Sequence, residues 1–162
     1  MLLTEFDDNR QAIINPEDLN EPLEGFPKIA VSCFSRSTFQ RMLEMFPHEL
    51  IYETSMANVA IPIYKLVIDE QELALFNAPV GASACVAILE DIFALGTDKL
   101  VLFGTCGVLD EDVKETSIII PSHALRDEGT SFHYVEASNE IAVNVGVLAC
   151  FRSYLNERQI PH

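Results

Sequence analysis

One strand–helix–strand pattern in the middle of the chain constrains the fold more than any other feature. An apolar run at 73–78 predicts a strand, and the helix expected at about 84–95 is opened by Gly81 and closed by Gly96. A second apolar run, Lys99–Phe103, predicts the next strand. A crossover of this kind makes its two strands parallel and is right-handed in nearly all proteins. We therefore expect an α/β fold in which these two strands are parallel neighbours.

Both predicted strands end in a bend that contains glycine. The first bend is Pro79-Val80-Gly81-Ala82-Ser83, and the second is Gly104-Thr105-Cys106-Gly107. Carboxyl ends of parallel strands share one edge of a sheet, where open α/β sheets bind their ligands. Gly81 and Ser83 form either an anion site at a helix start or a simple capped turn. Gly104 and Thr105 either let a ligand approach the backbone beside a hydroxyl or mark a plain strand exit. We expect the strand before Gly104 to be buried on both faces.

The rest of the chain divides into an acidic N-terminal arm at 1–27, interrupted by prolines, and a single α/β domain at 28–162. The expected elements of that domain follow in chain order. They are a strand at 28–34, a helix from Ser35 that stops before Pro47, strands at 51–55 and 59–68 with a bend at Pro62, a hairpin turn at 69–71, a strand at 117–120 and a helix at 140–157 capped by Asn139.

Charge excludes several partners. The chain has 25 acidic and 10 basic residues, a formal net charge of −15. This charge repels nucleic acids and anionic membranes, so we expect neither as a partner. A site for a small anion must be local, built from backbone N–H groups and a few arginines. Arg36, at the start of the first predicted helix, is either such an anion contact or an ordinary solvated side chain.

The N-terminal residues and the cysteines indicate where the protein is located and whether its thiols are reduced. The N-terminus has acids at Glu5, Asp7 and Asp8, unlike a signal peptide, and no apolar run approaches the ~20 residues of a membrane span. The four cysteines lie in or beside apolar runs without a C-x-x-C spacing, which predicts buried free thiols. We therefore expect a cytoplasmic protein without a metal.

A dense polar patch, Arg126–Tyr134, follows the second bend by about 20 residues and is a candidate site. Arg126 with Asp127 and Glu128 forms either an internal ion cluster that stiffens a loop or a direct ligand contact. His133 and Tyr134 either line an aromatic wall for a heterocycle or are structural. The patterns of a serine-nucleophile elbow and of a zinc hydrolase are absent from the sequence.

These residues together resemble a known family. Gly104–Leu109, then Ile119-Ile120-Pro121, then Arg126–Tyr134, in this order, are similar to the nucleoside phosphorylase superfamily, and within it to the uridine phosphorylase-like branch. The segment Pro79–Ser83 before a helix matches the preceding unit of the family. The resemblance runs from about Lys28 to the C-terminus.

The resemblance implies a three-layer α/β/α fold around a mixed, partly barrelled sheet. It implies a pentosyltransferase that cleaves a ribonucleoside, a uridine or a purine nucleoside, with phosphate as co-substrate and without a metal or organic cofactor. The products are the free base and ribose 1-phosphate. Thr105 matches the family's hydroxyl contact to phosphate and ribose, and Arg36 matches the arginine of its first phosphate loop. The resemblance also implies a homo-oligomer with shared sites.

Three positions depart from the family pattern. Ser32-Cys33-Phe34 stands where the family has Gly-Asp-Pro, and Leu102 stands where it commonly has a phosphate-binding arginine. The strands that hold ribose and base in the family have no counterpart before His162. We therefore expect a truncated domain that turns over substrate little or not at all by itself, or that requires a complementing C-terminal polypeptide. A nucleosidase, which uses water in place of phosphate, and a non-catalytic nucleoside-binding or assembly subunit are the alternatives.

Overall fold

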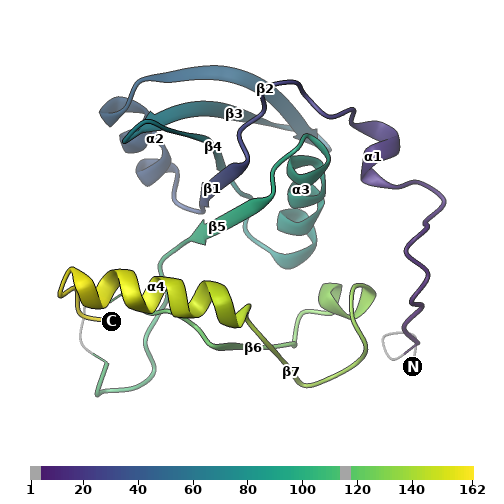
Figure 1. The fold of residues 1–162 in the computed structure, drawn as a ribbon. Coiled ribbons are helices and arrows are strands. Elements are labelled where there is room, and N and C mark those ends of the chain that lie inside the picture. The colour runs from purple at the N-terminus through teal and green to yellow at the C-terminus, as the bar shows by residue number, and fades with distance from the viewer. Residues whose placement is uncertain (1–4, 114–117) are drawn as a thin grey trace. The chain divides into compact units, whose positions relative to one another are not determined.

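The structure is a computed structural model and describes residues 5–113 and 118–162. It consists of two compact units, the sheet unit (residues 9–105) and the C-terminal unit (residues 1–8 and 106–162). The sheet unit contains α1 (Pro16–Leu19), β1 (Ile29–Cys33), α2 (Arg36–Met45), β2 (His48–Met56), β3 (Val59–Ile68), β4 (Gln71–Asn77), α3 (Ala82–Ala94) and β5 (Lys99–Phe103) (Figure 1). The C-terminal unit contains β6 (His123–Leu125), the 3₁₀ helix η2 (Thr130–His133), β7 (Glu140–Ala142) and α4 (Val145–Glu157).

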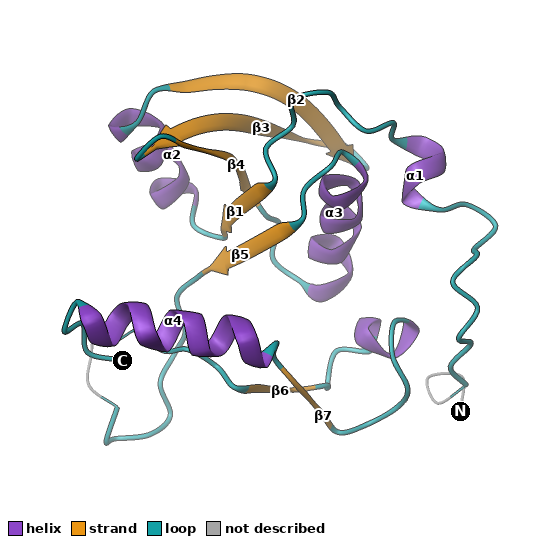
Figure 2. Ribbon diagram, in the orientation of Figure 1, coloured by secondary structure: helices purple, strands orange, loops and turns teal. Residues whose placement is uncertain are grey.

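The sheet unit is built on a five-stranded mixed sheet with the order β2-β3-β4-β1-β5. β1 is parallel to both of its neighbours, β4 and β5, whereas β2, β3 and β4 pair antiparallel. Figure 2 shows the arrows of β1 and β5 running in the same direction. The mixed sheet that the resemblance implies is therefore present. It is open, with β2 and β5 at its edges, rather than partly closed into a barrel.

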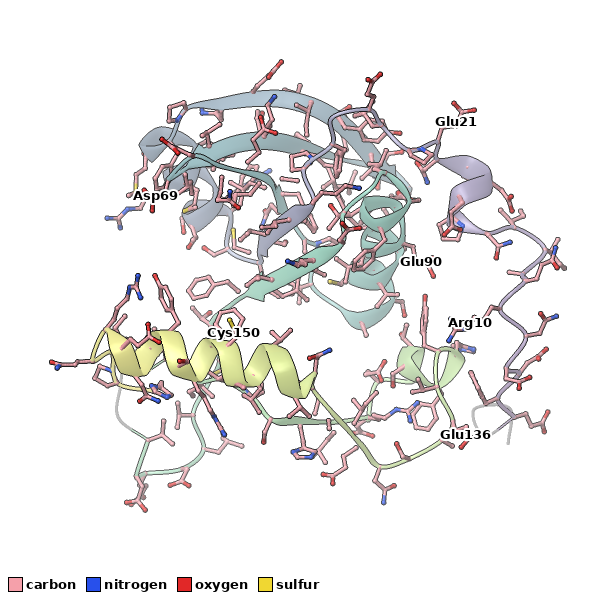
Figure 3. The ribbon with its side chains drawn as sticks, viewed as in Figure 1. Arg10, Glu21, Asp69, Glu90, Glu136 and Cys150 are labelled. Carbon is pink, nitrogen blue, oxygen red and sulfur yellow. The ribbon has the colours of Figure 1, made fainter. Side chains whose placement is uncertain are left out.

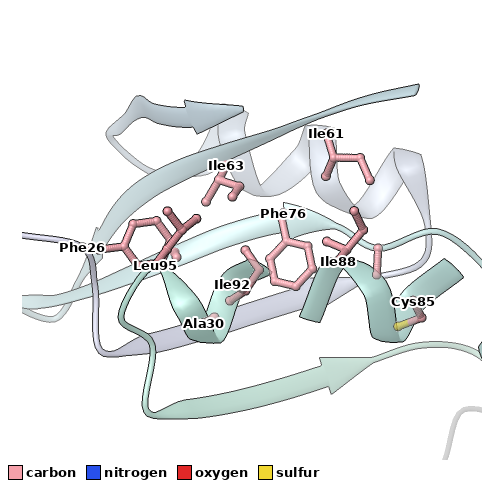
Figure 4. Close-up of a cluster of buried hydrophobic side chains, with 11 residues drawn as sticks. Phe26, Ala30, Ile61, Ile63, Phe76, Cys85, Ile88, Ile92 and Leu95 are labelled. Atoms are coloured by element: carbon pink, nitrogen blue, oxygen red, sulfur yellow. The ribbon is translucent and has the colours of Figure 1, made fainter. Parts of the chain in front are cut away.

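Two helices cover opposite faces of this sheet and make the three layers. Successive side chains of a strand point to opposite faces, and in β4 this places Phe76 and Leu75 in two different apolar clusters. Phe76 packs with Ile88 and Ile92 of α3, as Figure 4 shows. Leu75 packs in the other cluster with Phe39 of α2. The α/β/α layering is therefore confirmed for the sheet unit.

Local signals set the bounds of several elements as predicted. Ser35 caps α2, since its hydroxyl accepts a hydrogen bond from the Thr38 backbone N–H at 3.3 Å. The helix ends before Pro47. Asp69 and Glu70 form the two-residue turn between β3 and β4 and have φ values of 48° and 64°. Positive φ at both central positions is typical of a type I′ hairpin turn, which matches the twist of the strands.

The arrangement of the parallel strands differs from the prediction. β4 and β5 are parallel, but β1 lies between them: Ala30 is paired with Ala74 of β4, and Ile29 with Lys99 of β5. The crossover through α3 therefore skips one strand position. β5 is consequently an edge strand, and Leu102 and Phe103 are 44% and 54% exposed. The expectation that this strand is buried on both faces was wrong, because β1 is its only described partner.

The C-terminal unit also differs from the prediction. Residues 118–120 form no regular secondary structure, and Ser117 lies outside the described residues. β6 pairs antiparallel with β7, so Glu140–Ala142 is a strand and not the first turn of a helix. α4 begins at Val145 instead, where the Asn144 side chain accepts a hydrogen bond from the Val147 N–H at 3.1 Å. The cap is therefore Asn144 and not Asn139, because residues 140–142, which follow Asn139, pair with β6 as a strand.

The N-terminal segment 9–27 belongs to the sheet unit. Asn20 donates a hydrogen bond to Asp91 of α3 at 2.9 Å, and the Leu23 N–H donates to the Leu95 carbonyl at 3.1 Å. The arm is therefore fixed at the C-terminal half of α3. None of the helices in the described parts of the chain combines the length and the apolar character that a membrane span requires.

Replacement of Phe76 by alanine tests the buried layer between the sheet and α3. Phe76 is fully buried, and truncation of a buried phenylalanine costs about 3–5 kcal/mol. We expect Phe76→Ala to lower the free energy of unfolding by about this amount in urea titrations. The control Phe93→Ala removes an exposed ring of α3 that lies outside this buried cluster and should cost about 1 kcal/mol or less. Equal losses for the two variants would contradict the described packing.

Candidate functional site

Three strands of the sheet unit, β4, β1 and β5, end at the same edge because they run parallel. A pocket of about 600 Å³ lies at this edge. It is lined by residues at or after the ends of the three strands and by the first turns of α3, namely Phe34, Ser35, Val80, Gly81, Ala82, Cys85, Val86, Leu89, Leu102 and Thr105. Volumes of 300–1,000 Å³ are typical of small-molecule sites.

Two polar side chains, those of Ser32 and Asn77, link the ends of β1 and β4 by hydrogen bonds. Ser32 is completely buried, and its hydroxyl accepts a hydrogen bond from the Ala78 N–H at 3.0 Å. The Asn77 side-chain amide donates to the Cys33 carbonyl at 2.5 Å. These bonds satisfy backbone groups that the end of the strand ladder leaves without partners. They also fix the path on which the chain leaves β4 toward Gly81.

The bend at Gly81 leads directly into α3. Gly81 is the N-cap of this helix and has a φ of 113°, a region that side-chain-bearing residues rarely adopt. The Cys85 N–H donates to the Gly81 carbonyl at 2.9 Å, which closes the first helical turn. Gly81 and Ala82 both line the pocket. The positive end of the α3 dipole and its backbone N–H groups thus lie at the pocket wall, where an anion is favoured.

The second bend contributes Thr105 to the same pocket. Gly104 has a steric role there, because a Cβ at this position would lie 3.1 Å from the Phe34 ring. The group that approaches this glycine closely is therefore the aromatic ring of Phe34. The Thr105 side chain is exposed and supplies a hydroxyl beside a largely apolar wall. The structure thus places Gly81 and Thr105 together.

Other predicted site residues lie outside the pocket lining. Arg36 is the first residue of α2 and exposed, one position after the lining residue Ser35. Ser83 lies in the first turn of α3 and is exposed. Among the described residues that line the pocket, none carries a charged side chain. The sequence reasoning missed Phe34 and Ser35, although their position directly after a predicted parallel strand was a signal for both.

The second predicted patch lies in the C-terminal unit, where Arg126 is only 6% exposed. Its guanidinium donates to the Ser131 hydroxyl and carbonyl (2.9 Å each), the Val135 carbonyl (3.1 Å), the Glu136 carbonyl (2.5 Å) and the Ser138 hydroxyl (2.8 Å). Figure 3 labels Glu136 in this loop. The guanidinium carbon also lies 4.3 Å from the centre of the Phe132 ring. Arg126 therefore has the loop-stiffening contacts of the internal-cluster alternative.

Glu128 forms hydrogen bonds to Ser131 of the same loop and is itself exposed. Its carboxylate accepts hydrogen bonds from the Ser131 hydroxyl and from the Ser131 N–H, the latter at 3.0 Å. These bonds hold the pKa of the Glu128 carboxyl below its usual value, the hydroxyl contributing most and the backbone N–H next. Asp127, in contrast, is exposed beside Arg126. His133 ends η2, and Tyr134 follows it; both are exposed.

The thiols divide into two classes. Cys33 and Cys85 are buried, but Cys106 and Cys150 are exposed, and all four are free. The expectation of buried thiols was therefore wrong for the last two. Cys150 is labelled on α4 in Figure 3. Burial raises the pKa of the Cys33 and Cys85 thiols, so both stay protonated at neutral pH. Cys85 lines the pocket as a neutral group rather than a nucleophile.

Comparison with known proteins agrees with this architecture. A family model described as the phosphorylase superfamily matches residues 28–162. The chain belongs to this superfamily. Among curated proteins, the guanosine phosphorylase of Halorubrum lacusprofundi is 27% identical over 74 residues, which is 44% of this chain and 31% of that protein.

Solved structures share the fold. The uridine phosphorylase of Vibrio fischeri superposes with a TM-score of 0.74 at 15% identity, over 90% of this chain and 61% of that one. The purine nucleoside phosphorylase of Toxoplasma gondii gives 0.72 at 16% identity, over 87% and 58%. The 5′-methylthioadenosine/S-adenosylhomocysteine nucleosidase of Helicobacter pylori gives 0.65 at 20% identity, over 85% and 61%. The chain thus spans about three fifths of the length of these solved structures.

Alkylation rates test the two classes of thiol. We expect iodoacetamide at neutral pH to modify Cys106 and Cys150 first, and Cys33 and Cys85 only slowly, because a buried protonated thiol is a poor nucleophile. Peptide mass spectrometry at successive times gives the four rates. Denatured protein is the control and should show four similar rates. Fast modification of Cys85 in the native protein would contradict the described packing beside the pocket.

Acid titration tests the Glu128 contacts. The folded-state pKa of Glu128 lies below its unfolded value of 4.5. Its contribution to stability is therefore present above about pH 4.5 and lost as pH falls through the folded pKa. We expect Glu128→Gln to lower the thermal midpoint at pH 7, and the difference from wild type to shrink below pH 4.5. The control Glu44→Gln removes an exposed carboxylate of α2 and should leave the thermal midpoint at pH 7 close to that of wild type.

Proposed function

We propose that this protein acts on a ribonucleoside at the pocket formed by the Gly81 and Thr105 bends, with phosphate as co-substrate. The observation that supports the proposal most is that both bends, which follow two parallel strands, line one pocket together with the start of α3. Backbone N–H groups at that helix start favour an anion despite the net charge of −15. The Thr105 hydroxyl offers a hydrogen bond to phosphate or to ribose.

In this reaction the phosphate oxygen bonds to the anomeric carbon of the ribose as the bond from that carbon to the base nitrogen breaks. The electron pair of the broken bond leaves with the base, which gains a proton. The products are the free base, either uracil or a purine, and ribose 1-phosphate. The transition state resembles an oxocarbenium ion, so the site contributes positioning and charge stabilisation rather than a metal or an organic cofactor.

Hydrolysis is the second candidate, and one observation favours it. The described pocket lining lacks a charged side chain, and Leu102 forms part of it. Without a lining cation, phosphate depends on the backbone N–H groups and on the nearby Arg36, and water is a competing nucleophile. A nucleosidase of this kind would release free ribose. The choice between the two is therefore a question of phosphate affinity.

Ligand-induced stabilisation tests phosphate binding without requiring turnover. A ligand that binds the folded state raises its stability by RT ln(1 + [L]/Kd), about 2.7 kcal/mol at 100 times Kd. We expect inorganic phosphate, and separately uridine or guanosine, to raise the thermal midpoint relative to chloride at matched ionic strength. Arg36→Met should weaken the response to phosphate about tenfold in apparent affinity, because a charge-assisted hydrogen bond is lost. Arg41→Met, also exposed on α2, is the matched control and should respond like wild type.

Each outcome assigns a function. Responses to both phosphate and nucleoside support phosphorolysis. A response to nucleoside alone, with ribose as the product wherever base is released, supports hydrolysis. A response to nucleoside with no base released under either condition supports a non-catalytic binding subunit. The proposal fails if neither ligand shifts the midpoint at millimolar concentration.

The setting of this activity is also part of the proposal. We infer a cytoplasmic location, because four free thiols, two of them exposed, fit a reducing compartment. We further propose that the protein acts as a homo-oligomer or together with a complementing polypeptide. The chain covers 58–61% of the solved structures that it matches. Binding measurements therefore precede turnover measurements in the test above.

A further inference from the structure

A second pocket lies in the sheet unit and shares no lining residue with the pocket at the Gly81 bend. Its volume is about 390 Å³, within the range that is typical of small-molecule sites. Residues between 14 and 20 in the N-terminal arm, 55–56 at the end of β2 and 87–91 of α3 bound it, and we call it the arm pocket. Helices α1 and α3 are in contact beside it (Figure 1). The arm wall precedes residues 28–162, which the family model matches, so the superfamily likeness does not account for this pocket.

Asp91 of α3 lines the arm pocket and is half-buried. Its two carboxylate oxygens accept hydrogen bonds from the Thr54 hydroxyl at 2.5 Å and from the Asn20 side-chain amide at 2.9 Å. Both donors are neutral, so the described residues that contact Asp91 leave its negative charge unpaired. A carboxylate has about four lone-pair positions. Asp91 can therefore accept further hydrogen bonds from a ligand.

Most other side chains of the arm pocket are apolar. Ile88 of α3 belongs to the buried core, whereas Ile14 and Leu19 on the arm are 62% and 74% exposed. Glu90, labelled on α3 in Figure 3, adds a second carboxylate to the lining. Among the described residues that line this pocket, none is basic. The arm pocket therefore offers negative charge next to apolar side chains that still have surface to bury.

These features select the chemical class of the ligand. An anion is repelled by the two carboxylates, and a neutral apolar molecule leaves the charge of Asp91 unpaired. A metal ion needs several ligands, and in the described parts of the chain no three His, Cys, Asp or Glu side chains are grouped so that they could hold one. An organic cation remains, because its charged group can pair with Asp91 while its carbon chain covers the apolar side chains.

We propose that the arm pocket is a binding site for a small aliphatic amine. Such amines are protonated at neutral pH, as the lysine side chain is. The ammonium group donates hydrogen bonds to the Asp91 carboxylate, and the methylene chain packs against Ile14 and Leu19. The ligand thereby contacts both the arm and α3, which the Asn20–Asp91 hydrogen bond already links. The site is independent of the proposed nucleoside site, because the two pockets have no lining residue in common.

An NMR titration of the full chain with ethylamine and butylamine tests the proposal. We expect the backbone amide signals of residues 14–20 and 87–91 to shift with one common Kd. Each further buried methylene should lower the Kd about threefold, so butylamine should bind about tenfold more tightly than ethylamine. Sodium chloride at matched ionic strength is the reference for general screening. 1-Butanol has the same chain without the charge and should bind more weakly than butylamine.

Two variants locate the amine within the arm pocket. Asp91→Asn removes the charge and should raise the butylamine Kd about tenfold or more, because a charge-assisted hydrogen bond is lost. The matched control Glu44→Gln removes an exposed carboxylate of α2 outside the pocket lining and should change the Kd less than about twofold. Ala87→Phe places a ring at an exposed position of the pocket wall. It fills the volume, keeps the Asp91 carboxylate and should abolish binding, which provides a test even if Asp91→Asn loosens the arm.

Three results would overturn the proposal. Shifts spread over the whole sheet unit without saturation would show a general attraction of cations to a chain with a net charge of −15. Equal effects of Asp91→Asn and Glu44→Gln would show the same. Unchanged butylamine binding by Ala87→Phe would place the amine elsewhere. None of these results bears on the responses to phosphate and nucleoside at the Gly81 bend, so the proposed function stands or fails separately.

Discussion

The parallel pairing of β1 with two strands, β4 on one side and β5 on the other, is the constraint on which the candidate site depends. This pairing brings the carboxyl ends of β4, β1 and β5 to the same side of the sheet. A different segment follows each of these strands. After β1 comes the capped start of α2, after β4 the Gly81 bend, and after β5 the Gly104 bend. Ser32 and Asn77 add side-chain bonds at this edge, so the bends are fixed by more than the strand ladder.

Much of the fold could be predicted because the deciding signals are local. Ser35 and Pro47 predict where α2 begins and ends, and the helix observed in the structure agrees with this prediction. The turn at Asp69 and Glu70 is predicted by the apolar runs on both sides of it. Strand order could not be predicted in this way. The position of β1 between β4 and β5 depends on pairing between residues such as Ala30 and Ala74, which no neighbouring residue specifies.

In the C-terminal unit, a local sequence pattern predicted the wrong secondary structure. Residues 140–157 have an apolar stripe with helical spacing, yet Glu140–Ala142 pairs with β6 as a strand. The competing signal was Asn144, whose side chain caps α4 five residues later than expected. Similarly, nothing in the sequence of the Arg126 patch distinguishes a buried guanidinium from a ligand contact. The structure adds five hydrogen bonds from this guanidinium to acceptors of its own loop, three of them backbone carbonyls. The bends at Gly81 and Thr105, which line one pocket, could be predicted because glycine marks where a chain must turn.

The central place of β1 also has a kinetic consequence. This strand is made early, yet its partners are Ala74–Asn77 on one side and Lys99–Phe103 on the other. Loop closure over such separations must precede the favourable contacts, which makes topologies of this kind slow to fold. During synthesis, β1 therefore cannot pair until most of the sheet unit has been made. The β2–β3–β4 meander is complete before β5, and with it the strand ends that line the pocket, has been synthesised.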